Sequence, residues 1–299
     1  MMKRILALTV MLCLLLSPAM AATPDPIFAL DYDSLADPPA GVHHYLLACF
    51  DTWDFQETRM GNTDGLLLVT LDTAQDRMVF TSIMREILIQ RPDGKIGRIT
   101  YIVKNYGPEA LCRIVSTHFG VKVEKYLFFN MDNIQKMIDA LGGVYITVTD
   151  AEAYYLNRYR ISRDSTTPSM DRGGTYLFSG HAAVIYMRIR KVGGDGDAGR
   201  TRRVRTVLET LIRENNEISL SEAMGIAVAL TENVCMTNMS INDLMAAVSC
   251  IFALKGVKPE GFQLPTDASM ERIQYAGMDT NQVDFALCRS MFLKFMRME

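Results

Sequence analysis

The sequence predicts one α/β domain that extends from about residue 42 to the end of the 299-residue chain. Short apolar runs typical of strands alternate with longer segments whose apolar residues recur every three or four positions, as on one face of a helix. The composition agrees, because 49% of the residues are hydrophobic and 22% are charged. Such a balance supplies one sizeable core and excludes a disordered chain, a collagen and a protein with many membrane spans.

The first 21 residues have the three parts of a secretory signal. Two basic residues, Lys3 and Arg4, precede an almost wholly apolar run at 5–16 and the small-residue pattern Ala19-Met20-Ala21. We therefore expect export of the protein, with cleavage after Ala21. The alternative is an uncleaved anchor, although the apolar run is shorter than the roughly 20 residues that span a bilayer. Residues 22–41 contain four prolines and several acids and are predicted to form a linker.

The elements of the domain follow from apolar runs and their stop signals. A strand is expected at 45–50, and two apolar runs at 66–71 and 78–82 are separated by a polar turn, which predicts a hairpin. Proline near the first turn and Gly120 at the end delimit a helix at 108–119. The next predictions are a strand at 125–129, a helix closed by Gly142 and Gly143, a strand at 144–148 and a helix capped by Asp150.

The C-terminal half is predicted to be mainly helical. A polar, turn-rich loop is expected at 160–174, a helix at 179–186 and then a loop that contains four glycines. A long helix follows with a single apolar stripe, formed by Val204, Val207, Leu208, Leu211 and Ile212. Further helices are expected near 221–234, 240–254 and 283–297, with a strand near 262–264.

Charge and cysteine content exclude two classes of function. The formal net charge is −3, whereas a general nucleic-acid-binding protein normally has a broad basic surface. Five cysteines remain after the predicted cleavage, at irregular spacing and without paired histidines, so a zinc site is not expected. In an exported protein one disulfide among the last three is an option, and the simpler interpretation is that the cysteines are small buried apolar residues.

A basic cluster interrupts this acidic chain. Seven basic residues stand between Arg188 and Arg205, against two aspartates, which gives a local charge of +5. Arg188 and Arg190 would lie on one face of an extended segment, and Arg200 and Arg203 would share a helix face. Paired guanidinium donors suit a phosphate or pyrophosphate, and we expect these four arginines to bind one. The alternative is a solvated basic face, which we favour for Lys191, Arg202 and Arg205.

Acidic residues form a second candidate site. Asp51 follows the first predicted strand and Asp64 opens the next. Carboxylates at adjacent strand ends can hold a hard divalent cation that bridges phosphate oxygens, although aspartates at such positions are also common turn formers. A third feature is the pair Arg85–Glu86 after the strand at 78–82, for which a surface ion pair is the simplest interpretation.

Five segments resemble motifs of the LytR-CpsA-Psr family, and they stand in the family's order within residues 45–215. The family motifs are an R-S-D-T strand opening, S-I-P-R-D, D-A-L-G-G-V, Y-x-R-x-R and G-D-x-x-R-x-x-R-Q-R. The matching segments are, in the same order, GNTDGLLLV at 61–69, SIMRE at 82–86, IDALGGV at 138–144, YMRIR at 186–190 and GDAGRTRRVR at 196–205. The chain departs from the motifs at Met84, Glu86 and Val204; Val204 replaces a glutamine whose amide could orient a phosphate.

The resemblance implies a mixed central sheet flanked by helices and an enzyme at the outer face of the membrane or in the cell wall. Members transfer teichoic acids or capsular polysaccharides from a polyprenyl-pyrophosphate carrier, held in an apolar groove, onto peptidoglycan. In this chain the resemblance assigns Mg²⁺ (or Mn²⁺) to Asp51 and Asp64, and the pyrophosphate to Arg85, Arg188, Arg190 and Arg200.

The implied chemistry places Arg85, Arg190 and Asp64 among the catalytic residues. The arginines and the metal would stabilise the leaving polyprenyl phosphate while a peptidoglycan hydroxyl attacks phosphorus. Asp64 or Asp197 is a candidate acceptor of the hydroxyl proton. Two alternatives stay open: a pyrophosphatase that uses water as acceptor, and a module that binds a polyprenyl phosphate or glycan without turnover.

Overall fold

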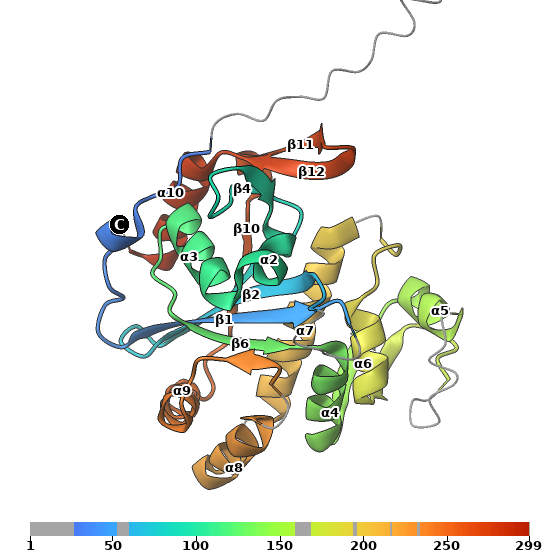
Figure 1. Cartoon of the computed structure of the whole chain (residues 1–299). Coiled ribbons are helices and arrows are strands. Elements are labelled where there is room, and N and C mark those ends of the chain that lie inside the picture. Colours follow the sequence, from blue (N-terminus) through green and yellow to red (C-terminus); the bar gives the residue numbers. More distant parts are fainter. Residues whose placement is uncertain are drawn as a thin grey trace, which may run out of the picture.

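The computed structural model describes residues 27–52, 60–158, 169–193, 196–215, 217–231 and 234–298 (Figure 1). The predicted signal at 1–21 and most of the loop predicted at 160–174 lie outside these residues. No helix in the described ranges combines the length and the apolar character that a bilayer crossing requires.

A six-stranded mixed sheet forms the centre, in the order β10-β3-β2-β1-β6-β9. The strands are β1 Val42–Phe50, β2 Thr63–Asp72, β3 Arg77–Ile83, β6 Lys125–Phe129, β9 Met236–Thr237 and β10 Glu260–Leu264. The pairs β1–β2, β2–β3 and β6–β9 are antiparallel, whereas β1–β6 and β3–β10 are parallel. The predicted hairpin and the mixed sheet implied by the resemblance are therefore confirmed.

Helices cover both faces of this sheet. The helices on one face are α2 Ile102–Tyr106, α3 Pro108–Phe119 and α10 Phe285–Met296, and those on the other side are α7 Gly196–Glu214, α8 Leu220–Thr231 and α9 Ile241–Ala253 (Figure 1). Strand β1 shows why both faces must be covered. Leu46 and Phe50 lie in the core cluster on one face of the sheet, whereas Tyr45 and Leu47 pack in the core cluster on the other face. Because alternate side chains of a strand point to opposite faces, a continuous apolar strand is buried on both.

A smaller unit packs beside the sheet and carries part of the basic cluster. It comprises α4 Met131–Ala140, β7 Val144–Val148, α5 Asp150–Arg158, β8 Gly174–Phe178 and α6 Gly180–Met187. Helix α6 lies so close to α4 that a Cβ atom at Gly180 would be 2.0 Å from the carbonyl oxygen of Gln135. Helix α7 lies between this unit and the sheet: Val207 packs into the unit, and Leu208 packs against the sheet. The predicted single apolar stripe is therefore divided between two cores.

The structure corrects several predicted elements. Strand β8 begins at Gly174, which the sequence placed in a loop, because the segment pairs with β7. Thr149 rather than Asp150 caps α5, since the Thr149 hydroxyl accepts the Glu152 amide proton at 3.2 Å. Two hairpins were not predicted, β4 Leu88–Gln90 with β5 Ile96–Arg98 and β11 Met270–Tyr275 with β12 Met278–Val283.

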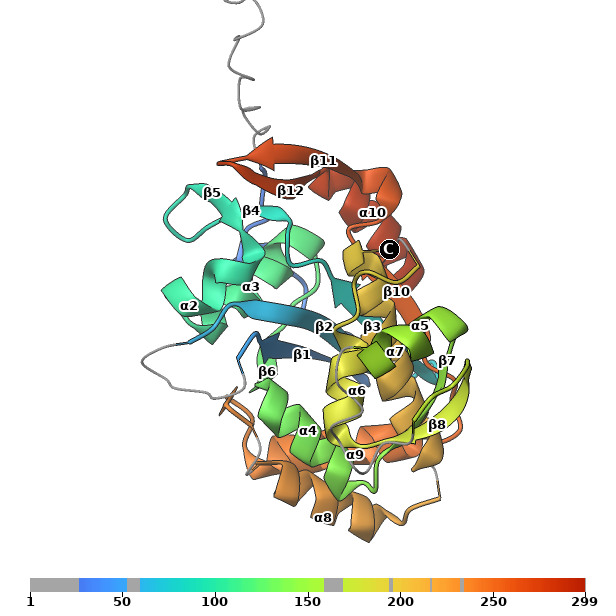
Figure 2. The same cartoon turned by 90° about the vertical axis from the view of Figure 1, so that its right-hand side faces the viewer.

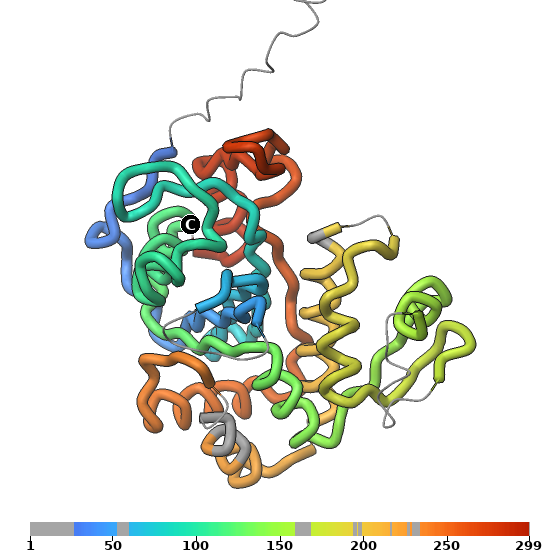
Figure 3. Tube along the Cα trace, turned by 45° about the vertical axis from the view of Figure 1, so that its right-hand side comes forward, coloured from blue at the N-terminus to red at the C-terminus, as the bar shows by residue number. Residues whose placement is uncertain are grey.

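The described part of the predicted linker lies against the domain rather than apart from it. The backbone amide of Leu30 donates to Thr117 O at 2.9 Å, and the Arg113 guanidinium lies 4.2 Å from the centre of the Tyr32 ring. The first described residues also lie beside α10 (Figure 3), where Arg289 donates to Phe28 O at 3.4 Å. Within the described ranges, the five cysteines that follow the predicted signal are all free thiols, and Cys112 and Cys288 are buried.

Two buried histidines make the stability of the fold depend on pH. The backbone amide of Gln90 donates to His118 Nε2 at 3.1 Å, and His118 Nδ1 donates to Ile114 O at 2.9 Å, which fixes the neutral ring. Burial lowers the pKa of both His118 and His44 to about 4. Between pH 6.5 and 4 the unfolded chain therefore binds protons that the folded protein does not, and the free energy of unfolding falls with decreasing pH, by about 1 kcal/mol per unit for each histidine.

We expect this loss to appear in urea unfolding measured at several pH values between 7 and 4. In His118→Gln the slope of the free energy of unfolding against pH becomes shallower, because one of the two groups no longer titrates. A slope equal to that of the wild type would contradict the assignment.

Candidate active site

A buried carboxylate, Asp64, collects three arginines from distant parts of the chain. Asp64 is the second residue of β2 and is 9% exposed. Its Oδ2 lies 3.1 Å from Arg200 Nη1 and 3.5 Å from Arg190 Nη2, and its Oδ1 pairs with Arg85 Nη1. These contacts bring the segment after β3, the segment after α6 and the first half of α7 to the start of β2. The structure thus brings together four of the predicted site residues.

Three guanidinium groups meet at the Asp64 carboxylate. One of them, that of Arg85, also pairs with Glu86, whose Oε1 lies 3.2 Å from Arg85 Nη2. Because Arg85 reaches Asp64 as well as Glu86, the simple surface ion pair accounts for only part of its role. The cluster is therefore suited to bind an anion.

The arginines differ in how firmly they are held. The side chains of Arg200 and Arg85 are 8% and 16% exposed, whereas that of Arg190 is 41% exposed. Arg85 follows Met84, which is buried in the main core and whose amide donates to Leu264 O at 2.8 Å. The site thus has two fixed donors and one that is open to solvent.

Arg188 lies at the edge of the cluster, and its backbone is not extended as predicted. It is the C-cap of α6, with φ −92° and ψ −2°. Its guanidinium contacts the sulfur of Met131. Arg188 and Arg200 both lie near Cys49, where they oppose the effect of burial, which raises the pKa of the thiol to about 12. The two arginines therefore share one neighbour, although in the described part of the chain only Arg200 of these two contacts Asp64.

Arg203, which the sequence predicts to bind pyrophosphate beside Arg200, has other partners in the structure. Arg203 is 6% exposed, and its Nε lies 2.7 Å from Glu152 Oε1. Its two other nitrogens donate to backbone carbonyls, Nη1 to Ile189 at 3.0 Å and Nη2 to Val192 at 3.3 Å. Positions three apart on a helix are about 60° apart around its axis, which directs the two side chains to different surroundings. Arg203 thus binds the backbone on both sides of Arg190.

Asp51 lies at the same edge of the sheet but has a different environment. Its Oδ1 accepts the backbone amide proton of Asn62 at 2.8 Å, and its Oδ2 lies 3.4 Å from Asn62 Nδ2. It therefore stabilises the turn before β2, which is the alternative that the sequence left open. Among the described residues no group of three or more His, Cys, Asp and Glu side chains is placed to hold a metal ion. The side chain of Asp197 is outside the described residues.

A fit of Mg²⁺ to this edge is partial. Both Asp64 oxygens contact arginines, whereas Asp51 Oδ2 has only the longer contact with the Asn62 amide and keeps acceptor capacity. Mg²⁺ commonly binds one or two carboxylates together with substrate phosphates, so a protein cage is not required. The metal assignment to Asp51 and Asp64 stays a prediction.

Glu152 is a residue of this region that the sequence analysis missed. It is 8% exposed, and its second oxygen accepts the backbone amide proton of Thr149 at 2.9 Å. The pattern Thr149-x-x-Glu152 is a capping box, which announces a helix start but not that the other carboxylate oxygen binds Arg203. Only the packing of α5 against α7 reveals that second contact.

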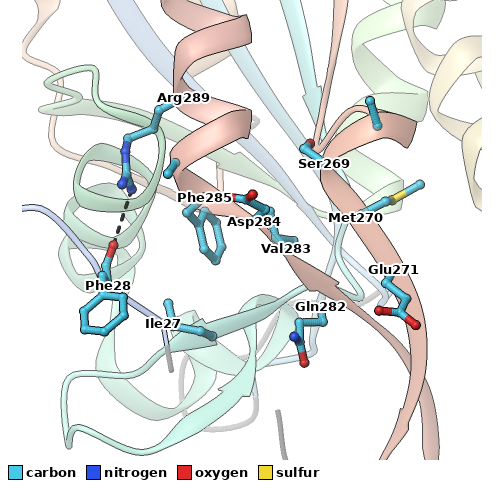
Figure 4. Close-up of a pocket in the computed structure, with 12 residues that line it drawn as sticks. Ile27, Phe28, Ser269, Met270, Glu271, Gln282, Val283, Asp284, Phe285 and Arg289 are labelled. Atoms are coloured by element: carbon cyan, nitrogen blue, oxygen red, sulfur yellow. Dashed lines mark hydrogen bonds between the residues drawn. The ribbon is translucent and has the colours of Figure 1, made fainter. Parts of the chain in front are cut away.

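A cavity of about 440 Å³ lies away from this cluster, between α10, the β11–β12 hairpin and residues 27–28 (Figure 4). Its lining mixes apolar side chains such as Phe285 with charged ones such as Glu271 and Arg289. None of the predicted site residues contributes to it.

Comparisons with known proteins agree with the fold and the motifs. The polyisoprenyl-teichoic acid–peptidoglycan teichoic acid transferase TagU of Oceanobacillus iheyensis is 25% identical over 202 residues, which cover 66% of this chain and 59% of that protein. Biofilm regulatory protein A of Streptococcus mutans is 28% identical over 207 residues, 66% of this chain and 50% of that protein. The chain thus matches between half and three fifths of the length of these relatives.

Solved structures share the fold. A crystal structure of TagV from Bacillus subtilis has a TM-score of 0.67 at 20% identity and covers 88% of this chain and 100% of that one. A structure of TagT bound to LIIa-WTA has a TM-score of 0.66 at 20% identity, with 92% and 97% covered. The family model named LytR_cpsA_psr matches residues 43–287, which include every motif quoted above. The chain therefore belongs to the LytR_cpsA_psr family.

Proposed function

We propose that the protein transfers an anionic glycopolymer, such as a teichoic acid or capsular polysaccharide, from a polyprenyl-pyrophosphate carrier to peptidoglycan. The observation that carries this proposal is the convergence of Arg85, Arg190 and Arg200 on the buried carboxylate of Asp64. The named activities of the TagU and TagV relatives support the same reaction class. Such a substrate is met at the outer face of the membrane, and the signal predicted at 1–21 supports export to that place.

The cluster explains how pyrophosphate would be activated. Arg85, Arg190 and Arg200 donate to its oxygens in place of Asp64, and these donors are preset around one point before the substrate arrives. A peptidoglycan hydroxyl attacks the phosphorus attached to the glycan, the bond from that phosphorus to the bridging oxygen breaks, and polyprenyl phosphate leaves with the electron pair. Arginine charge stabilises this leaving group, because negative charge develops on it. Asp64, released from the arginines, or Asp197 would accept the hydroxyl proton.

Mg²⁺ or Mn²⁺ belongs to the same proposal. Asp51 and Asp64 would bind the ion together with pyrophosphate oxygens, and the ion would add positive charge where the leaving group forms. Asp51 has the acceptor capacity for this through Oδ2.

The face of the sheet that α7, α8 and α9 cover is the candidate binding place for the polyprenyl chain. The core cluster on this face is buried at its centre, but the apolar side chains packed around it are only partly buried; they are Leu47, Leu127, Leu208, Ile212, Leu244, Ala247, Cys250 and Val257. Helix α9 has no fully buried residue. The cavity beside α10 is a poorer candidate, because Glu271, Asp284 and Arg289 line it. Burial of a lipid tail under α9 would remove this apolar surface from water.

Two alternative functions use the same site. A pyrophosphatase would direct water rather than a glycan hydroxyl at phosphorus, and a binding module would hold the lipid without turnover. Val204 lacks the glutamine amide that could orient a phosphate, which favours the binding module. Its side chain packs against the smaller unit that contains α4, α5 and α6. A glutamine amide at this position is thus replaced by apolar packing, while Arg85, Arg190 and Arg200 keep their contacts with Asp64.

A transfer assay with mass-spectrometric detection separates the three functions. The protein is incubated with a synthetic polyprenyl-pyrophosphate glycan, short peptidoglycan strands and Mg²⁺, alongside Arg85→Ala. We expect a glycan–phosphate–peptidoglycan adduct that the variant does not form. Free glycan phosphate without adduct would identify a pyrophosphatase, and unchanged lipid that is nevertheless bound would identify a binding module.

A further inference from the structure

A buried ion pair lies behind the arginine cluster. Glu152 on α5 and Arg203 on α7 are 8% and 6% exposed, and Arg203 Nε lies 2.7 Å from Glu152 Oε1. Figure 2 shows α5, α6 and α7 gathered on the same side of the molecule. Withdrawal of two charges from water is costly, and their mutual attraction only roughly offsets that cost. Fold stability alone is therefore a weak account of the pair.

The contacts of Arg203 point to a different role. Its Nη1 and Nη2 donate to Ile189 O and Val192 O, the carbonyls on either side of Arg190. The chain at 189–192 is neither helix nor strand. Arg190 itself is 41% exposed and reaches Asp64 at 3.5 Å. The two Arg203 contacts hold the backbone on either side of Arg190.

Glu152 in turn fixes Arg203. One Glu152 oxygen accepts from Arg203 Nε, and the other accepts from the Thr149 amide at 2.9 Å and the Thr149 hydroxyl at 3.1 Å. The Arg203 guanidinium also lies 5.9 Å from the centre of the Tyr186 ring on α6. A continuous series of contacts thus runs from the start of α5 through Arg203 to Arg190.

We propose that Glu152 and Arg203 are positioning residues that aim Arg190 at the pyrophosphate. The inference rests on the proposed function in one respect, because it takes Arg190 to bind that group. Neither residue contacts the substrate; they set the position of the backbone from which Arg190 extends. Errors of about 1 Å in such a position can lower binding and turnover by up to about 100-fold.

The chain contains a matched control for this geometry. Arg77, which is 5% exposed, pairs with Glu260 through Nε at 2.8 Å and Nη2 at 2.9 Å. It also donates to two backbone carbonyls, Phe295 O at 3.1 Å and Met296 O at 3.3 Å. As in Glu152–Arg203, a buried arginine binds one carboxylate and two backbone carbonyls, although the Glu260 side chain is 39% exposed. These contacts join the start of β3 to β10 and to the end of α10. Substitutions of Arg77 and Glu260 therefore show how much stability is lost when such a set of arginine contacts is broken.

The test measures binding of farnesyl pyrophosphate by titration calorimetry. We expect Arg203→Lys and Glu152→Gln to weaken binding by about 10- to 100-fold, because lysine cannot span two carbonyls and glutamine does not pair with the guanidinium charge. In the Arg190→Ala background the same substitutions should have little further effect, since they act through Arg190. Arg77→Lys and Glu260→Gln should lower the unfolding midpoint and leave the affinity unchanged.

Each other outcome has a defined meaning. Losses that add fully to that of Arg190→Ala, or an affinity equal to the wild type, overturn the positioning role. If Arg203→Lys does not fold, Glu152→Gln decides by the same criteria. A wild-type protein that binds farnesyl pyrophosphate but does not transfer glycan defeats the proposed function and leaves the inference standing, whereas absence of binding defeats both.

Discussion

Arg200→Ala is expected to lower kcat/KM for glycopolymer transfer by about 100- to 1,000-fold, the range for loss of one fixed donor to developing negative charge. Arg200 is the most firmly held arginine of the site, since its side chain is 8% exposed and its Nη1 lies 3.1 Å from Asp64 Oδ2. Such a donor needs little rearrangement when the leaving group becomes charged. The measurement is the initial rate of adduct formation from a polyprenyl-pyrophosphate glycan.

Arg202→Ala is the control for this experiment. Arg202 stands two residues further along α7, carries the same charge and is exposed. A surface arginine contributes mainly a screened charge, so the rate should change by no more than about twofold. Equal losses in both variants would show that the net charge of α7, rather than the fixed position of Arg200, supports the reaction.

Asp64→Asn should separate turnover from anion binding. We expect kcat to fall by about 100-fold or more, because the carboxylate that can accept the hydroxyl proton is gone. Binding of inorganic pyrophosphate without metal should not weaken, since the carboxylate that competes for Arg190 and Arg200 is removed. Kinetics and calorimetry on the same preparation measure the two effects.

Asp72→Asn provides the matched control for Asp64→Asn. Asp72 ends the same strand, is 6% exposed and accepts the Ala74 amide proton at 3.0 Å. Its substitution should cost stability and leave both kcat and pyrophosphate binding unchanged. Wild-type turnover in Asp64→Asn, with correct folding shown by its thermal unfolding, would remove Asp64 from the reaction.

The arginine cluster shows how far local sequence leads. Guanidinium groups, glycines and family motifs coincide in one segment, and this coincidence predicts Arg188, Arg190 and Arg200 as site residues. Arg203 belongs to the same segment and differs only in its surroundings, which Glu152 and two carbonyl oxygens supply. Residues 51 positions apart in the chain form that pair, so no pattern within α7 distinguishes Arg203 from Arg200.

The sequence by itself determined the elements whose signals are local. The β2–β3 hairpin follows from two apolar runs around a polar turn, and α3 ends at Gly120 as predicted, where φ is +82°. The family motifs identified the mixed sheet and three of the arginines around Asp64. These features depend on side-chain type and spacing, which a sequence contains directly.

Only the tertiary structure decided the features that depend on a partner. Strand β8 exists because β7 lies beside it, and the β4–β5 and β11–β12 hairpins are short enough that pairing, rather than propensity, fixes them. The stripe of α7 is divided because that helix lies between two cores. The site also depends on tertiary partners, because a buried charge must be paired. Asp64 contacts Arg85, Arg190 and Arg200, whereas Arg203 pairs with Glu152.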